Sequence, residues 1–144
     1  MLHFDDLPDE ATMEYGEHAV TEDELIVFAR EFDPQPMHID RAWPGGLIAS
    51  GWFTVGVLMR LTVEHVLRGM ASLGSPGVES CDWLAPVRPG DVLRAHARIA
   101  GKRASKSRPD MGLFALENGL TNQRGTKVIA MKGAMMVRRR GSVP

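Results

Sequence analysis

The segment Gly51–Leu61, GWFTVGVLMRL, limits the folds open to this chain more than any other feature. Its apolar side chains follow one another at nearly every position, so a helix built from it is apolar around its whole circumference. Such a helix is buried, and other parts of the chain have to surround it. We predict one long helix from about Ser50 to Ser72, with Arg60, Glu64 and Arg68 forming a solvated stripe on its later turns.

The part of the chain after Gly77 supplies the surrounding structure. Four segments there alternate apolar and polar residues, as strands do, and short polar turns separate them. Strands joined by short turns predict an antiparallel meander. The predicted strands are Val78–Ala85, Val92–Ala104, Leu113–Asn122 and Thr126–Arg138. One apolar helix and one antiparallel sheet indicate an α+β fold with the sheet curled around the helix, and 144 residues suit a single domain over 1–144.

The N-terminal part contains a second helix signal. Thr21 and Glu24 match a capping box, and Pro34 disfavours a helical conformation at the residue before it, so we predict a helix from Thr21 to near Phe32. Residues 1–16 are acidic and are predicted to be irregular, with a short strand over residues 17–20. The prolines of DPQPMHID predict an extended or turn-like path directly after the helix.

Composition narrows the function classes. The net charge of −1 does not favour nucleic acid as a partner, and the single cysteine, Cys81, excludes an internal disulfide. We see no signal peptide and no apolar run long enough for a membrane span, so we expect a cytoplasmic protein without a membrane partner. The histidines outside the proline-containing segment are dispersed, and we expect no metal site; they are His3, His18, His65 and His96.

The proline-containing segment carries the candidate chemistry. Asp33 and His38 lie on a restricted loop that leads through Gly45-Gly46 to a helix start near Gly51. A carboxylate and an imidazole can hold one water between them and move its protons, and the amide groups at a helix start can stabilise charge on a carbonyl oxygen. The alternative is that Asp33 only caps a turn and that His38 is structural.

The motifs FDPQPMHID and GGLIASGW, with the later VRPGD and NQRG, resemble those of the MaoC-like dehydratases, a family that includes the R-specific enoyl-CoA hydratases. The resemblance implies the hot-dog fold, in which a curved antiparallel sheet wraps one long helix. It also implies that Asp33 and His38 bind and activate a water, and that the Gly51 N–H is an oxyanion donor. Ser50 and Trp52, which flank Gly51, are implied to take part in substrate binding.

The implied reaction adds water to a 2-enoyl thioester, or removes it from a 3-hydroxyacyl thioester. Coenzyme A or acyl carrier protein would be part of the substrate, no further cofactor is expected, and the expected assembly is a homodimer or a larger dimer-based oligomer. Only IDRAWP separates His38 from Gly45, a shorter connection than in many relatives, and Gly56 falls near the place of a serine in some hydratases. Trp43 could fill part of that gap or only pack on the surface.

Several alternatives remain open from the sequence. A hot-dog thioesterase would direct the activated water at the thioester carbonyl, and a non-catalytic module would bind acyl thioesters without turnover. Gly51 could serve only to permit close packing of the helix on the sheet. A basic cluster around a predicted turn could meet the phosphates of coenzyme A or remain solvated; it comprises Lys102, Arg103, Lys106 and Arg108.

Overall fold

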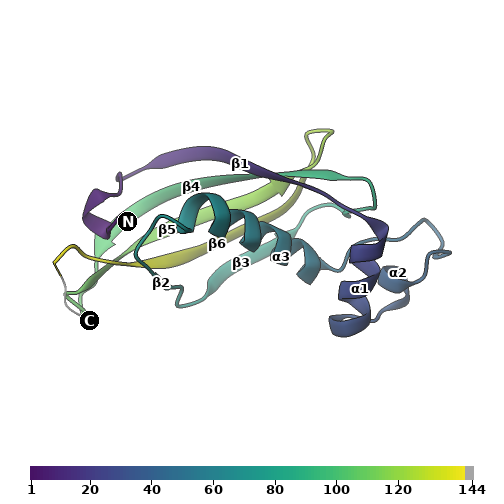
Figure 1. Cartoon of the computed structure of the whole chain (residues 1–144), viewed down its shortest axis with the longest axis horizontal. Coiled ribbons are helices and arrows are strands. Elements are labelled where there is room, and N and C mark those ends of the chain that lie inside the picture. Colours follow the sequence, from purple (N-terminus) through teal and green to yellow (C-terminus); the bar gives the residue numbers. More distant parts are fainter. Residues whose placement is uncertain (142–144) are drawn as a thin grey trace.

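One curved antiparallel sheet and one central helix dominate the protein, as seen in a computed structural model that describes residues 1–141 (Figure 1). The strands lie in the order β1-β4-β5-β6-β2, and β3 also pairs with β6. Their bounds are β1 (Ala11–Ala19), β2 (Ser72–Gly74), β3 (Val78–Trp83), β4 (Val92–Ala104), β5 (Met111–Thr121) and β6 (Lys127–Arg138). The helices are α1 (Glu22–Phe32), α2 (Pro36–Ile39) and α3 (Gly51–Thr62), with a 3-10 turn η1 (Phe4–Asp6) and a π-helical turn η2 (Val63–Leu67).

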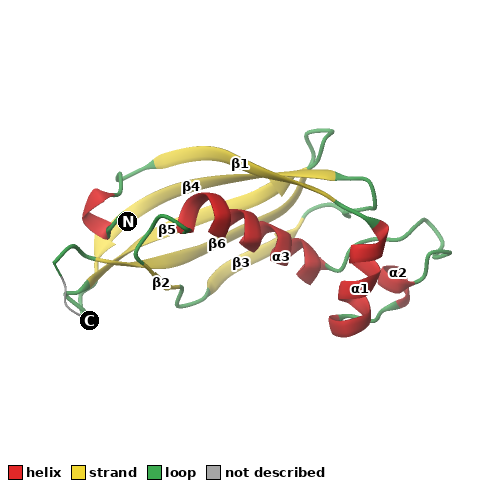
Figure 2. Cartoon of the chain, in the orientation of Figure 1, coloured by secondary structure: helices red, strands yellow, loops and turns green. Residues whose placement is uncertain are grey.

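Helix α3 lies along the inner face of the sheet, while α1 and α2 stand together at one end of the molecule (Figure 2). Alternate residues of β4 and its neighbours face the helix, and one apolar cluster joins Leu58 of α3 to Leu93, Leu120 and Ile129. A second cluster closes the opposite end of the molecule around Phe114. The predicted α+β hot-dog arrangement is thus confirmed.

The predicted irregular lead-in over residues 1–16 is wrong. Residues 4–6 form η1, and β1 begins at Ala11 and pairs with β4. The register of this pairing shifts between Tyr15 and Glu17, where Gly16 has φ +64° and lies so close to His65 that a Cβ there would be 2.9 Å from its ring. The bulge interrupts the two-residue alternation, which explains why the pattern in the sequence is weak.

The predicted meander is correct only for β4, β5 and β6. Strand β3 pairs with β6 and not with the next strand, β4. The segment Pro86–Asp91 therefore carries the chain from the strand beside β6 past β6 and β5 to β4. Strand β2 was not predicted. Strands β4, β5 and β6 are neighbours in the chain, whereas the pairing of β3 depends on residues about fifty positions away.

The long helix also departs from its prediction. It keeps α-helical geometry only to Thr62 and continues as η2 to Leu67. The sheet covers only part of its circumference, because Trp52 is 59% exposed and Met59 is 48% exposed. Arg60 and Glu64 form an ion pair with 4.0 Å between Nε and Oε1, but Arg68 forms none with residues 1–141. No helix in the described part of the chain is both long enough and apolar enough to span a membrane.

The two ends of the described chain are tied together by charge. Arg139 pairs with Asp5, and Arg140 pairs with Asp6, so this basic segment is anchored to the N-terminal turn. The Arg140 guanidinium and the backbone N–H of His3 lower the pKa of Asp6 to about 2. These contacts hold η1 beside the end of β6.

We predict that Phe114→Ala lowers the free energy of unfolding by about 3–5 kcal/mol, because Phe114 is 1% exposed and its removal leaves a cavity. Val27→Ala, at a position that is 68% exposed on α1, should change it by less than about 0.5 kcal/mol. Urea unfolding followed by circular dichroism measures both. Equal effects of the two variants would contradict the core described above.

Candidate active site

Four segments bring the predicted acid and imidazole together. Asp33 follows the last residue of α1, His38 lies in α2, Ile48 lies in the loop before α3, and Ser50 caps the start of α3. The sequence predicts an extended or turn-like path after Asp33, but residues 36–39 form a short helix. Pro36 is compatible with it because proline is tolerated in the first turn, where its missing N–H has no intrahelical partner.

The imidazole of His38 is buried, at 6% exposed, and its orientation is defined by a backbone carbonyl. Its Nδ1 lies 2.9 Å from the carbonyl oxygen of Ile48. A carbonyl oxygen only accepts hydrogen bonds, so Nδ1 carries the proton. In the neutral ring, Nε2 is therefore the unprotonated nitrogen. This nitrogen lies 3.4 Å from Oδ2 of Asp33.

The carboxylate of Asp33 is held by two side-chain donors. Gln35 Nε2 donates to Oδ1 at 2.8 Å, and Ser50 Oγ donates to Oδ2 at 2.7 Å. These bonds, led by that from Gln35, lower the pKa of Asp33 below its ordinary value. The carboxylate and Nε2 of neutral His38 are both hydrogen-bond acceptors, so a water that donates one proton to each satisfies both. The lone pairs of the water oxygen then point away from both groups.

Gly51 lies beside this pair, at the first residue of α3. Among residues 1–141 its N–H has no hydrogen-bond acceptor, as expected at a helix start. Its carbonyl oxygen accepts from Trp83 Nε1 at 2.9 Å, and a Cβ at Gly51 would lie only 2.5 Å from that nitrogen. Close packing against Trp83 therefore explains why residue 51 is a glycine. The same position leaves the Gly51 N–H available to a hydrogen-bond acceptor.

Two tryptophans form an apolar wall next to the pair. The rings of Trp52 and Trp83 meet edge to face with 5.2 Å between their centroids. They line a cavity of about 460 Å³ that also contains Asp33, His38 and Gly51. The structure thus brings together all five predicted site residues, since Ser50 bonds to Asp33 and caps α3.

Sequence reasoning missed three participants: Gln35, Ile48 and Trp83. Gln35 stands two residues after Asp33, a spacing that allows a local side-chain contact, so the sequence contained a signal for it. Ile48 acts through its carbonyl, which any residue has, and Trp83 comes from a distant strand. Neither has a local sequence signal.

Side chains from other segments hold the short connection over residues 39–46 in place. Arg41 pairs with Glu22 and Asp23 at the start of α1, and Arg88 Nη1 donates to the Gly45 carbonyl at 2.8 Å. Trp43 is half-buried and does not line the cavity, so it does not fill the gap left by the short connection.

The basic cluster that could have met coenzyme A phosphates lies elsewhere. Lys102 Nζ donates to the Leu7 carbonyl at 2.6 Å, and Arg108 pairs with Asp110. Figure 1 places the N-terminal turn that Lys102 contacts at the end of the molecule opposite α1 and α2.

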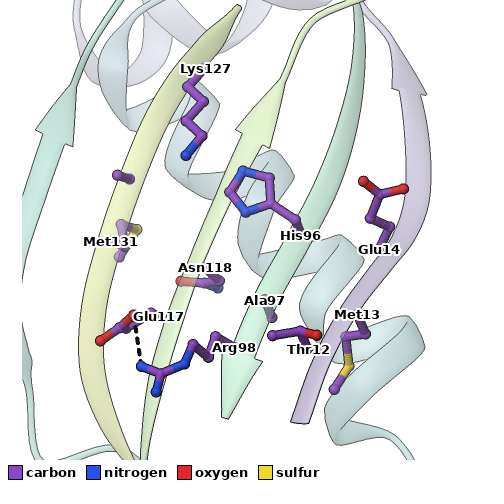
Figure 3. A pocket seen from close by; sticks show the side chains of 11 residues that line it. Thr12, Met13, Glu14, His96, Ala97, Arg98, Glu117, Asn118, Lys127 and Met131 are labelled. Carbon is purple, nitrogen blue, oxygen red and sulfur yellow. Dashed lines mark ion pairs between the residues drawn. The ribbon is translucent and has the colours of Figure 1, made fainter. Parts of the chain in front are cut away.

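A larger depression of about 590 Å³ lies on the outer face of the sheet, with α3 behind it (Figure 3). Charged residues dominate it, and Arg98 and Glu117 form an ion pair with 3.6 Å between Nη1 and Oε2. Burial and the nearby Lys127 ammonium lower the pKa of His96, which favours a neutral ring there. This depression lacks the paired acid and imidazole of the inner cavity.

Comparison with known proteins agrees with the fold. Residues 4–114 match the family described as the MaoC like domain. A solved MaoC-like dehydratase from Rhodospirillum rubrum is 33% identical, covers 99% of this chain and 100% of its own, and superposes with a TM-score of 0.84. The R-hydratase PhaJ1 from Pseudomonas aeruginosa is 21% identical over 99% of this chain and 93% of its own, with a TM-score of 0.74, which shows a shared fold.

A third relative is the uncharacterized protein YdeM of Bacillus subtilis, 28% identical over 83% of this chain and 87% of its own length. The curved sheet, the central helix and these matches define a hot-dog protein of the hydratase and dehydratase class. The chain belongs to the MaoC-like dehydratase family.

We predict that Gly51→Ala lowers the free energy of unfolding by about 1–3 kcal/mol, because the added methyl group overlaps the Trp83 indole. In Gly51→Ala/Trp83→Ala the indole is absent, so the double variant should be more stable than the sum of the two single effects by about 1 kcal/mol or more. Urea unfolding of the four proteins gives the coupling energy. Additive effects would show that the indole is not what excludes a side chain at Gly51.

We predict a pH-dependent contribution of Asp33 to stability. Its folded pKa is lowered, so this contribution is present above the unfolded pKa and disappears as the pH falls through the folded value. The difference in unfolding free energy between wild type and Asp33→Asn should therefore be constant above about pH 5 and shrink below about pH 4. Urea midpoints at pH 7, 5 and 3 measure it. A difference that grows on acidification would contradict the lowered pKa.

Proposed function

We propose that this protein is a hydro-lyase that adds water to a 2-enoyl thioester, or removes it from a 3-hydroxyacyl thioester, of coenzyme A or acyl carrier protein. The observation that carries the proposal is the 3.4 Å separation between Asp33 Oδ2 and His38 Nε2, two acceptors that both line the cavity and are close enough for one water beside them to donate to both. The Ile48 carbonyl fixes the tautomer that makes Nε2 an acceptor. Membership of the MaoC-like family supports the same class of reaction.

In the hydration direction the bound water donates one proton to His38 Nε2 while its oxygen attacks C3 of the enoyl group. The electron pair of the C2–C3 double bond moves towards the thioester carbonyl and forms an enolate. The imidazolium of His38 then returns the proton to C2, so one water has been added and the enzyme is restored. Asp33 stays ionised because its pKa is lowered; it orients the water and stabilises the imidazolium.

The remaining predicted residues have roles that follow from their positions. The Gly51 N–H, which has no acceptor within residues 1–141, would donate to the enolate oxygen. Loss of one such donor typically raises the barrier by about 3 kcal/mol. Ser50 positions Asp33, and Trp52 with Trp83 forms a flat apolar wall for the conjugated acyl group.

We also propose a homodimer, formed through the free edge of β3, that acts in the cytoplasm without a metal or cofactor of its own. Within residues 1–141, β3 pairs with β6 alone, so its other edge carries unpaired backbone groups. Large exposed apolar side chains lie on β3 and the residue after it, and on α3 and η2; they include Trp52, Met59, Val63, Val78, Trp83 and Leu84. Such a surface is typical of a subunit interface.

A panel of straight and branched enoyl-CoA thioesters tests the activity. We expect loss of the conjugated absorbance with the thioester intact, and a decrease in kcat of about 10²- to 10⁴-fold in Asp33→Asn and in His38→Gln. Asp40→Asn is the matched control, because Asp40 is exposed on the same segment and accepts from the Ala42 N–H. It should retain full activity.

Two other outcomes would overturn the proposal. Release of thiol, detected with a thiol reagent, would indicate a thioesterase. Saturable binding without turnover, unchanged in Asp33→Asn, would indicate a non-catalytic acyl-thioester-binding module.

A further inference from the structure

Thr54 is a buried polar residue in the first turn of α3. It is 2% exposed, and it lines the same cavity as Asp33, His38 and Gly51. Buried hydroxyl groups normally have a hydrogen-bond partner, because an unpaired hydroxyl loses its water without a replacement. The Thr54 hydroxyl has no such partner within residues 1–141. A free hydroxyl in this cavity therefore has to be explained.

The helix backbone does not supply the missing partner. In helices the hydroxyl of a threonine often donates to the carbonyl four residues earlier. Thr62 of the same helix does so, with 2.8 Å between its Oγ1 and the Leu58 carbonyl oxygen. For Thr54 the corresponding carbonyl belongs to Ser50, and within residues 1–141 it accepts only the Thr54 N–H, at 3.3 Å. The proton of the Thr54 hydroxyl is thus available to another acceptor.

The Thr54 oxygen is open to the cavity. Within residues 1–141, the buried side-chain atoms that lack both a partner and an open surface are His3 Nδ1 and His96 Nε2. Thr54 Oγ1 is not one of them although it also lacks a partner, so part of its surface is open. Because Thr54 lines the cavity of the candidate active site, we assign that open surface to this cavity.

The Thr54 hydroxyl and the Gly51 N–H come from the same helical turn. Three residues separate them, which is about 4.5 Å along the helix axis. Side chains in a helix lean towards its N-terminus, so the Thr54 side chain lies back over the turn that begins at Gly51. The first N–H groups of a helix point in that direction too. Two free donors therefore border one part of the cavity.

The other polar side chains in the cavity wall are already engaged. Gln35 donates to Asp33, and Trp83 donates to the Gly51 carbonyl. Asp33 and His38 hold the water in the proposed function, and neither donates to an incoming carbonyl oxygen. A ligand acceptor that enters this cavity therefore finds its free donors on the first turn of α3.

We propose that the Thr54 hydroxyl is a second hydrogen-bond donor to the thioester carbonyl oxygen, beside the Gly51 N–H. A carbonyl oxygen has two lone pairs and can accept both bonds. Negative charge grows on this oxygen as the enolate forms, so both bonds strengthen in the transition state. The effect on turnover rests on the proposed function, whereas the hydrogen bond itself requires only a thioester in the cavity.

Two substitutions separate the hydroxyl from the shape of the side chain. Thr54→Val removes the hydroxyl at nearly constant volume, and Thr54→Ser retains it. We expect Thr54→Val to lower kcat for the enoyl-CoA substrate about 10²-fold with little change in KM, because the lost bond is strongest in the transition state. Thr54→Ser should retain most of the activity. The free energy of unfolding of Thr54→Val should not fall, since the hydroxyl has no partner to lose.

Infrared spectroscopy tests the hydrogen bond without turnover. The probes are butyryl-CoA and decanoyl-CoA, saturated thioesters that cannot be hydrated, each isotopically labelled at the thioester carbonyl. A hydrogen-bond donor weakens the C=O bond and lowers its stretching frequency. We expect a higher carbonyl frequency for the probe bound to Thr54→Val than for the probe bound to wild type, and no such rise in Thr54→Ser. Thr54→Ala, which also lacks the hydroxyl, provides the same comparison if the valine variant folds poorly.

Equal carbonyl frequencies in the wild-type and Thr54→Val complexes would overturn the inference, as would failure of the wild type to bind either probe. Hydration at the wild-type rate in Thr54→Val would also overturn it while leaving the proposed function intact. If the frequency rises in Thr54→Val but no enoyl-CoA is hydrated, the hydrogen bond is supported and the hydratase proposal fails.

Discussion

The contact between α3 and the inner face of the sheet positions every other functional feature of this protein. Leu58 packs against Leu93, Leu120 and Ile129, so three strands from the second half of the chain fix the axis of a helix from the first half. Because the helix is held along its length, its first residue, Gly51, has a defined place relative to Trp83 on β3. The candidate active site forms where the start of this helix meets the loop from α2.

Local signals in the sequence predicted local structure well. The Thr21–Glu24 capping box forms as expected, and α1 ends at Phe32, before Asp33 and Pro34. The strands β4, β5 and β6 were predicted within a few residues, because their alternation is regular and each pairs with the next strand along the chain. The bulge at Gly16 and the pairing of β3 with β6 were missed, because both depend on contacts between distant residues.

The same distinction applies to the site. Asp33 and His38 were predicted to hold one water together, and the structure places their side chains 3.4 Å apart. The sequence could not predict that the Ile48 carbonyl selects the imidazole tautomer, because a carbonyl belongs to every residue. Nor could it predict that Trp83 covers Gly51, since that contact spans thirty-two positions in the chain. The catalytic roles of Asp33 and His38 are a proposal.

The edge-to-face pair of Trp52 and Trp83 has an optical consequence. The chain contains three tryptophans, and two of them line the cavity with Asp33 and His38. Indole emission depends on the polarity and the quenching groups around the ring. Two of the three indole fluorophores of this protein therefore line this cavity, and we expect the indole emission of the unlabelled protein to change when the cavity is filled.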